Sequence, residues 1–198
     1  MSKDIDFLFE IGRMRFIQRA WQRFFLTKVA NDAEHTFRVM WLSLIIAKKE
    51  KIKNEEKIIK MALVHDITES RTGDVDYLSR LYSERKENTA ISDMLDGVSL
   101  EDEFIKLWEE LEKKETIEAK IIKDADNLDI DLELMEQKDS NLEIVDWKLK
   151  NRQKIIPKKL FTETAKIMFK EIYSSDAHNW HINSRNNRFR TGDWKNNE

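Results

Sequence analysis

Apolar residues recur every three or four positions along most of the chain. From about Ala33 to Lys49 this spacing predicts a helix, because residues three and four apart share one face of an α-helix. Asn31 and Asp32 precede the stretch and are typical of an N-cap. We expect the apolar side chains of this helix to face inward: Phe37, Met40, Trp41, Leu44 and Ile45.

The same spacing predicts helices over most of the remaining chain. Asn54 and Thr116 are expected to cap two of them, Ser99 with Asp102 resembles a capping box, and Pro157 suits the first turn of the last helix. The pattern lapses over 69–85, where we expect a loop with at most one short helix. The other expected helical segments are 5–25, 54–64, 103–114, 117–137, 141–153 and 157–173.

Glycine and proline are rare, with four and one in 198 residues. Sheet-rich folds use many glycine and proline turns, so this composition favours an all-α fold. We predict a single helical bundle of about seven to nine helices with an irregular C-terminal tail. The helical pattern ends near Ser174, which places the domain in 1–175 and a polar tail in 176–198.

Charged residues make up 37% of the chain, yet the formal net charge is only −3. Because the two signs are interleaved, we expect no stable binding to nucleic acid. The longest apolar stretch, 40–47, is too short to cross a bilayer, and the N-terminus lacks the pattern of a secretion signal. We therefore expect no membrane association and a cytoplasmic location. The absence of cysteine excludes disulfides, thiolate catalysis and cysteine zinc sites.

Ionisable residues interrupt the apolar faces of three predicted helices. His35 lies near the start of one helix, His65 and Asp66 near the end of another, and Asp126 in the middle of a third. Such groups are costly to bury unless they are paired or bind metal. Three helices can pack so that these four side chains converge. Their two imidazoles and two carboxylates predict a site for one divalent ion, such as Mn, Co, Fe, Ni or Zn, with Mg also open.

The order His35, His65-Asp66 and Asp126 resembles the HD-domain metal-dependent phosphohydrolases. The resemblance runs from about Arg19 to Gln137 and is most like the YfbR-type 5′-deoxynucleotidases. In that group a glutamate follows the His-Asp pair and precedes Thr-Gly-Asp; here these are Glu69 and 72–74. The third segment resembles Lys-x-x-Asp, which makes Asp126 the implied metal ligand and not Asp124.

This resemblance implies roles for two further carboxylates. Glu69 lies four residues after His65, on the same helical face if the helix continues, and it could orient or deprotonate a water molecule. Asp74 resembles the family aspartate that contacts substrate and assists catalysis. We therefore expect Glu69 and Asp74 to be the catalytic residues.

Substrate binding requires a cation for the phosphate and surfaces for the rest of the nucleotide. The family carries an arginine–tryptophan element before its first metal histidine. Trp21 has the family's spacing, whereas Arg19 is displaced by one residue because Ala20 intervenes, which leaves Arg13, Arg19 and Arg23 open as the phosphate clamp. The family's proline-containing segment is replaced by residues that could still line the pocket. The expected substrate-binding residues are Arg19, Trp21, Asp76 and Tyr77.

The implied activity is hydrolysis of a (deoxy)nucleoside 5′-monophosphate, by a homodimer or larger homo-oligomer. A deoxynucleoside triphosphate triphosphohydrolase on the same scaffold would share the metal and Glu69. A regulatory module would bind nucleotide without turning it over. His178 and His181 have metal-ligand spacing, but they lie in the polar, aperiodic stretch and we interpret them as part of a surface tail.

Overall fold

The computed structural model describes residues 2–25, 28–140 and 142–183. Within these ranges the chain is all-α, as predicted, with no strand and one isolated β-bridge, between Gln18 and Asn31. The α-helices are α1 (Lys3–Ile11), α2 (Asp32–Lys49), α3 (Glu55–Val64), α4 (Glu69–Thr72), α5 (Glu87–Leu95), α6 (Glu101–Lys113), α7 (Ile117–Glu136), α8 (Glu143–Ile155), α9 (Glu163–Ser174) and α10 (Asn179–Ile182).

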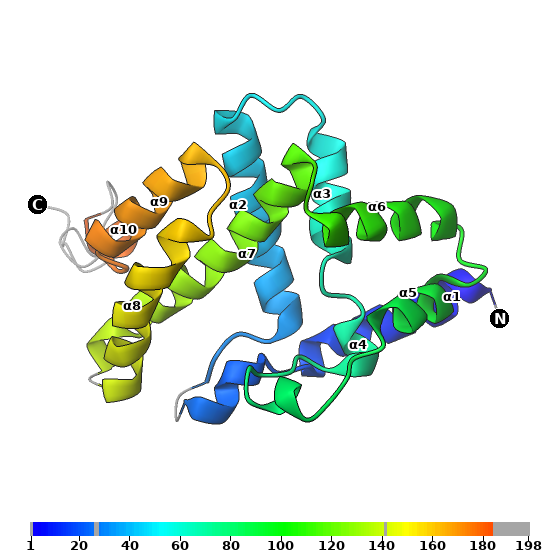
Figure 1. The fold of residues 1–198 in the computed structure, drawn as a ribbon, viewed down its shortest axis with the longest axis horizontal. Coiled ribbons are helices and arrows are strands. Elements are labelled where there is room, and N and C mark those ends of the chain that lie inside the picture. The colour runs from blue at the N-terminus through cyan, green and yellow to red at the C-terminus, as the bar shows by residue number, and fades with distance from the viewer. Residues whose placement is uncertain (1, 26–27, 141, 184–198) are drawn as a thin grey trace, which may run out of the picture.

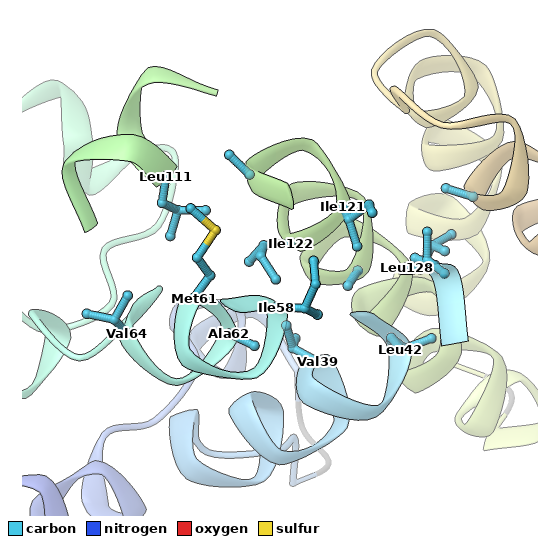
Figure 2. Close-up of a cluster of buried hydrophobic side chains, with 14 of the residues drawn as sticks. Val39, Leu42, Ile58, Met61, Ala62, Val64, Leu111, Ile121, Ile122 and Leu128 are labelled. Carbon is cyan, nitrogen blue, oxygen red and sulfur yellow. The ribbon is translucent and has the colours of Figure 1, made fainter. Parts of the chain in front are cut away.

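The central helices α2, α3 and α7 pack against one another, with α6 across one end of the group (Figure 1). Helices α8 and α9 lie together on one side of α7, and α1, α4 and α5 gather on the other side of the molecule. Figure 2 shows side chains from α2, α3, α6 and α7 meeting in one apolar core. Its fully buried members include Val39, Ile58, Met61, Ile121 and Leu128. This core holds α2 and α7, which carry His35 and Asp126, and α3, which ends just before His65 and Asp66.

The orientation of α2 differs from the sequence prediction. The residues that face the core are Val39, Leu42 and Ile46, together with His35 and Ser43, whereas Phe37, Trp41 and Ile45 are exposed. Met40 and Leu44 are half-buried. The prediction is confirmed for Met40 and Leu44, which pack against the core, and wrong for Phe37, Trp41 and Ile45. The error arises because α2 has apolar residues on two faces, and periodicity alone does not decide which of them contacts α3 and α7.

Three of the predicted helix starts are confirmed by their capping hydrogen bonds, and at α3 the Asn54 side chain accepts the Lys57 N–H. Asn31 and Glu34 form a reciprocal capping box at α2, and the Thr116 side chain accepts the Ala119 N–H at α7. The predicted capping box of Ser99 and Asp102 is wrong. Helix α6 begins after Leu100 without a side-chain cap, because the Ser99 N–H donates to the Asp4 carboxylate instead.

The helices differ from the sequence prediction at three places. The segment 5–25 is not one helix: α1 ends at Ile11, and the 3₁₀ turns η1 (Gly12–Phe16) and η2 (Ala20–Phe24) follow. Helix α5 lies just beyond the expected loop and was not predicted. Pro157 belongs to the 3₁₀ turn η5 (Ile156–Lys158), and α9 begins later, capped by Thr162. Shorter 3₁₀ turns occur at η3 (Ser79–Leu81) and η4 (Lys138–Ser140).

No helix in the described ranges has both the length and the apolar character that a bilayer crossing requires.

Asp124 has a structural role that separates it from its neighbour Asp126. Its carboxylate is fully buried and accepts three hydrogen bonds of 2.8 Å, from the Phe161 N–H, the Thr162 N–H and the Thr162 hydroxyl. These bonds attach the start of α9 to the middle of α7. Burial raises the pKa of Asp124 above its ordinary value, although the three donors oppose that shift.

We expect Asp124→Ala to lower the free energy of unfolding by about 2–4 kcal/mol, because it leaves buried donors unsatisfied. Asp124→Asn keeps an acceptor oxygen and is expected to lose less. Chemical denaturation measures both variants, with the exposed Asp93→Ala on α5 as a control that stays within about 0.5 kcal/mol of the wild type. Equal stability of Asp124→Ala and Asp93→Ala would show that this contact does not hold α9.

Candidate metal centre

The four predicted metal ligands converge between α2, α3 and α7. The His35 Nε2 atom lies 3.3 Å from the His65 Nε2 atom, 3.5 Å from an Asp66 carboxylate oxygen and 3.4 Å from an Asp126 carboxylate oxygen. The same Asp66 oxygen is 3.1 Å from the His65 Nε2 atom. Residues up to 91 positions apart in sequence, from His35 to Asp126, therefore present two imidazole nitrogens and two carboxylate oxygens to one point.

Each histidine is oriented through its other ring nitrogen. The Nδ1 atom of His35 is 2.5 Å from the Asp129 carboxylate, and the Nδ1 atom of His65 is 2.7 Å from the Ala62 carbonyl oxygen. A proton on each Nδ1 atom leaves the Nε2 lone pair directed to the shared point, which is the arrangement of metal-binding histidines. Arg38 holds Asp129 by a further ion pair. Sequence reasoning missed Asp129, although it lies one helical turn after Asp126.

Arg19 is the arginine that reaches this group. Its guanidinium is buried and lies 3.3 Å from Asp66 and 3.9 Å from both Asp74 and Asp126. Burial opposes its charge, but the surrounding carboxylates raise its pKa above the ordinary value. Of the two alternatives, Arg23 pairs with Asp76 at 3.1 Å and Arg13 lies over the Phe16 ring.

Glu69 enters the site from α4 and not from a continuation of α3. Helix α3 ends at Val64 and the chain turns before α4 begins at Glu69, so the helix does not continue from His65 to Glu69. The Glu69 carboxylate is nonetheless buried beside the cluster and pairs with Arg85 at 2.9 Å through one oxygen. Its second oxygen accepts no hydrogen bond from the described residues. Burial and the charges of Asp66 and Asp74 raise the pKa of Glu69 to about 10.

A second acidic group adjoins the first. Asp32, Glu69 and Asp74 each offer an oxygen within 4.8 Å of the others. Asp32 is fully buried, and neither of its carboxylate oxygens accepts a hydrogen bond from the described part of the chain. Burial raises the pKa of Asp32 to about 7, although Arg19 opposes that shift. From the sequence, Asp32 was expected only to form part of the N-cap with Asn31, because both residues precede the apolar stretch of the helix.

Asp74 also fixes the chain that carries Arg19. The Ala20 N–H donates to the Asp74 carboxylate at 2.7 Å, which ties η2 to the loop after Gly73. Gly73 has a φ of +69°, in the left-handed region that favours glycine, so the Thr-Gly-Asp sequence provides the turn that brings Asp74 back to η2. Arg19 and Asp74 are therefore positioned together.

A cavity of about 590 Å³ opens beside the metal ligands and is large enough for a nucleotide. All four predicted substrate-binding residues line it: Arg19, Trp21, Asp76 and Tyr77. Tyr77 stacks on Phe24 with ring centroids 5.5 Å apart, and the Lys148 amine lies 5.4 Å from the centroid of Tyr77. The carboxylate of Asp76 is engaged by Ser79 and Arg23. Arg85 and Lys148 were not identified from sequence, because nothing local marks a lysine or arginine that faces a distant cavity.

The donor set fits a divalent ion. Neutral imidazole and carboxylate together suit Mn, Co, Fe, Ni or Zn, and the carboxylates also suit Mg. Burial and Arg19 lower the pKa of His35, yet hydrogen bonds to Asp126, Asp129 and Asp66 raise it well above the ordinary value. The negative charge of the surrounding carboxylates raises the pKa of His35, and the same charge would attract a metal cation.

The histidines of the predicted tail lie apart from this centre. His178 and His181 are near α10, with ring nitrogens 3.1 Å apart. His178 is exposed and His181 is half-buried. The arginines and aromatic residues after Asn183 lie outside the described residues.

The model of the HD domain family matches residues 11–168. The chain belongs to the HD-domain family. Among curated relatives, the 5′-deoxynucleotidase HDDC2 of Danio rerio is 31% identical over 137 residues, covering 66% of this chain and 67% of the relative. The HDDC2 protein of Dictyostelium discoideum is 31% identical over 148 residues, covering 69% and 78%, respectively.

Solved structures share the fold. A conserved hypothetical protein of Pyrococcus furiosus has a TM-score of 0.71 at 24% identity, covering 86% of this chain and 99% of that protein. A structure described as a predicted metal-dependent phosphohydrolase from Magnetospirillum magnetotacticum has a TM-score of 0.67 at 19% identity, covering 87% and 90%. These likenesses show that the chain shares its helical fold with both proteins.

We expect His65→Ala and Asp126→Ala to remove bound metal almost completely, because each deletes one donor of a four-residue set. Elemental analysis after loading with Mn²⁺ or Co²⁺ and desalting measures the loss. His178→Ala is a matched control that removes a histidine outside the cluster. Retention of wild-type metal content by both cluster variants would contradict the assignment.

We also expect metal binding to release protons at pH 7. Glu69 holds a proton at this pH because its pKa is about 10, and a bound cation would favour its ionised form. Metal affinity should therefore rise with pH below about 10. Calorimetric titration of Mn²⁺ in two buffers of different ionisation enthalpy measures the released protons. Glu69→Gln should release up to about one proton fewer, and the absence of release from the wild type would contradict this protonation.

Proposed function

We propose that the protein is a metal-dependent phosphohydrolase that releases phosphate from (deoxy)nucleoside 5′-monophosphates. The observation that carries this proposal is the convergence of His35, His65, Asp66 and Asp126 beside a nucleotide-sized cavity, in a chain of the HD-domain family. The 5′-deoxynucleotidase names of the relatives support the monophosphate as substrate.

His35, His65, Asp66 and Asp126 would hold one divalent ion. When bound there, such an ion would supply Lewis-acid chemistry, drawing charge from a phosphoryl oxygen and making a nearby water molecule more acidic. Arg19 would hold the phosphate through its planar guanidinium, which is already anchored among the carboxylates. Its positive charge would offset the charge that develops on the phosphoryl oxygens.

Glu69 would orient the attacking water and accept its proton. The water oxygen forms the new bond to phosphorus as the bond from phosphorus to the ester oxygen breaks. The leaving ester oxygen of the nucleoside takes a proton from solvent. Arg85 holds one oxygen of Glu69, which leaves the second oxygen available to the water. Asp74 would assist by fixing the Arg19 segment through the Ala20 N–H.

The base and sugar would occupy the outer part of the cavity. Trp21 and Tyr77 provide apolar surfaces there, and the engaged carboxylate of Asp76 keeps the Tyr77 loop attached to Arg23. We further propose that the chain works as a homodimer. The cytoplasmic location expected from the sequence stays a prediction.

A triphosphate substrate remains the second candidate because the cavity carries further cations. Arg80, Lys114, Lys148 and Lys159 line it in addition to Arg19. Product analysis distinguishes the two activities: dAMP yields inorganic phosphate in the first case, and dATP yields tripolyphosphate in the second. A binding module would release neither product with Mn²⁺, Co²⁺ or Mg²⁺ present, and that result would overturn both proposals.

We expect Glu69→Gln to lower the rate of phosphate release by about 10²–10⁴-fold while the bound metal is retained, because it removes a proton acceptor but no member of the metal set. Single-turnover assays with dAMP and elemental analysis on the same sample measure the two properties. Glu112→Gln, another glutamate that lines the cavity, serves as the control. Turnover by Glu69→Gln at the wild-type rate would show that the assigned role is wrong.

A further inference from the structure

The outward face of α2 is apolar, although solvent-facing helix surfaces are normally polar. Phe37, Trp41 and Ile45 are 60%, 58% and 44% exposed. They follow one another at four-residue spacing and so form one line along the helix, which we call the α2 stripe. The opposite face of α2 supplies Val39 and Ile46 to the core. A helix that is apolar on both faces is suited to contacts on both.

Charges of opposite sign stand at the two ends of the α2 stripe. Glu34 lies one turn before Phe37 and is exposed, while Lys48 lies one turn after Ile45 with its side chain 82% exposed. Glu34 contributes one carboxylate oxygen to the capping box through the Asn31 N–H. A groove of about 380 Å³ adjoins Phe37 and offers space for side chains of an opposing surface.

The sequence of the stripe is symmetrical about Trp41. Phe37 and Ile45 lie four residues to either side of Trp41, and Glu34 and Lys48 lie seven residues to either side. If two copies of α2 pack antiparallel about Trp41, each Phe37 meets an Ile45 and each Glu34 meets a Lys48. Parallel packing would instead set Glu34 against Glu34 and Lys48 against Lys48, which is unfavourable.

We propose that the α2 stripe binds a second copy of this chain, with the two α2 helices antiparallel and the two-fold axis at Trp41. The interface is isologous, because the same surface contributes from both copies. The three apolar side chains form its centre and the charged residues its rim, which is the usual anatomy of such interfaces. This proposal is independent of the proposed activity, since none of the three side chains lines the cavity.

The exposed apolar residues of helix α1 lack this complementarity. Helix α1 exposes Ile5, Leu8 and Phe9, but it has acidic residues in its first turn and no basic residue in its last. Helix α2 has Asp32 and Glu34 in its first turn and Lys48 and Lys49 in its last. Antiparallel pairing therefore brings opposite charges together at α2 and does not do so at α1.

The first test is the oligomeric state of the full chain, measured by sedimentation equilibrium over a wide range of concentrations. We expect a dimer, and we expect Trp41→Glu to weaken it by about 100-fold or more, because it replaces a central aromatic residue with a charge. Phe9→Glu on α1 and Ile167→Glu on α9 are matched controls at exposed positions and should remain dimeric. Thermal melting by circular dichroism checks that each variant is folded.

Three results would overturn the proposal: a monomeric wild type, a Trp41→Glu variant that dimerises as tightly as the wild type, or a dimer broken by Phe9→Glu and not by Trp41→Glu. Should Trp41→Glu fail to fold, Trp41→Ser offers a milder change at the same position. A folded Trp41→Ser variant that dimerises as tightly as the wild type would equally overturn the proposal.

The second test determines the register by disulfide formation, for which the chain gives no background because it has no cysteine. Trp41→Cys should cross-link to itself under mild oxidation. Lys48→Cys should not, because its two copies would stand about 21 Å apart along the helices, beyond the reach of about 7 Å between Cα atoms. A mixture of Glu34→Cys and Lys48→Cys should form the mixed dimer. Self-linkage of Lys48→Cys as fast as that of Trp41→Cys would contradict the antiparallel register.

Discussion

Buried negative charge around His35 is the constraint on which the rest of the structure depends. Asp66, Asp126 and Asp129 approach its ring from α7 and from the end of α3, and the acidic group of Asp32, Glu69 and Asp74 lies close by. Burying so many carboxylates is costly unless cations compensate them. Arg19 and Arg38 provide part of that compensation. The proposed divalent ion would provide more, which links the chemistry of the site to the stability of the fold.

The apolar core makes this concentration of charge possible. Val39, Ile58 and Ile121 pack α2, α3 and α7 together. This packing fixes the start of α2, the end of α3 and the middle of α7, where the proposed ligands lie. Asp124 illustrates how neighbouring carboxylates take different roles on one helix. It faces away from the metal ligands and secures the start of α9, whereas Asp126 faces the cluster.

Helix α2 accordingly contributes three surfaces to the molecule. One carries His35 to the metal centre, a second packs in the core, and the third is the exposed stripe centred on Trp41. His35 on α2 meets Asp129 on α7, and Val39 and Ile46 of the same helix pack in the core. The apolar side chains of the third surface are exposed as a consequence, and the proposed dimer would cover them.

The sequence by itself determined the all-α class, the capped starts of α2, α3 and α7, and the residues expected at the metal centre. These features are encoded locally, by periodicity, capping residues and the motif around His65. Tertiary structure decided which face of α2 is buried, which arginine reaches the cluster, and that Asp32, Arg85 and Asp129 belong to the site. Such properties depend on the rotation and packing of helices far apart in sequence. A local pattern cannot fix that rotation when a helix, like α2, has apolar residues on more than one face.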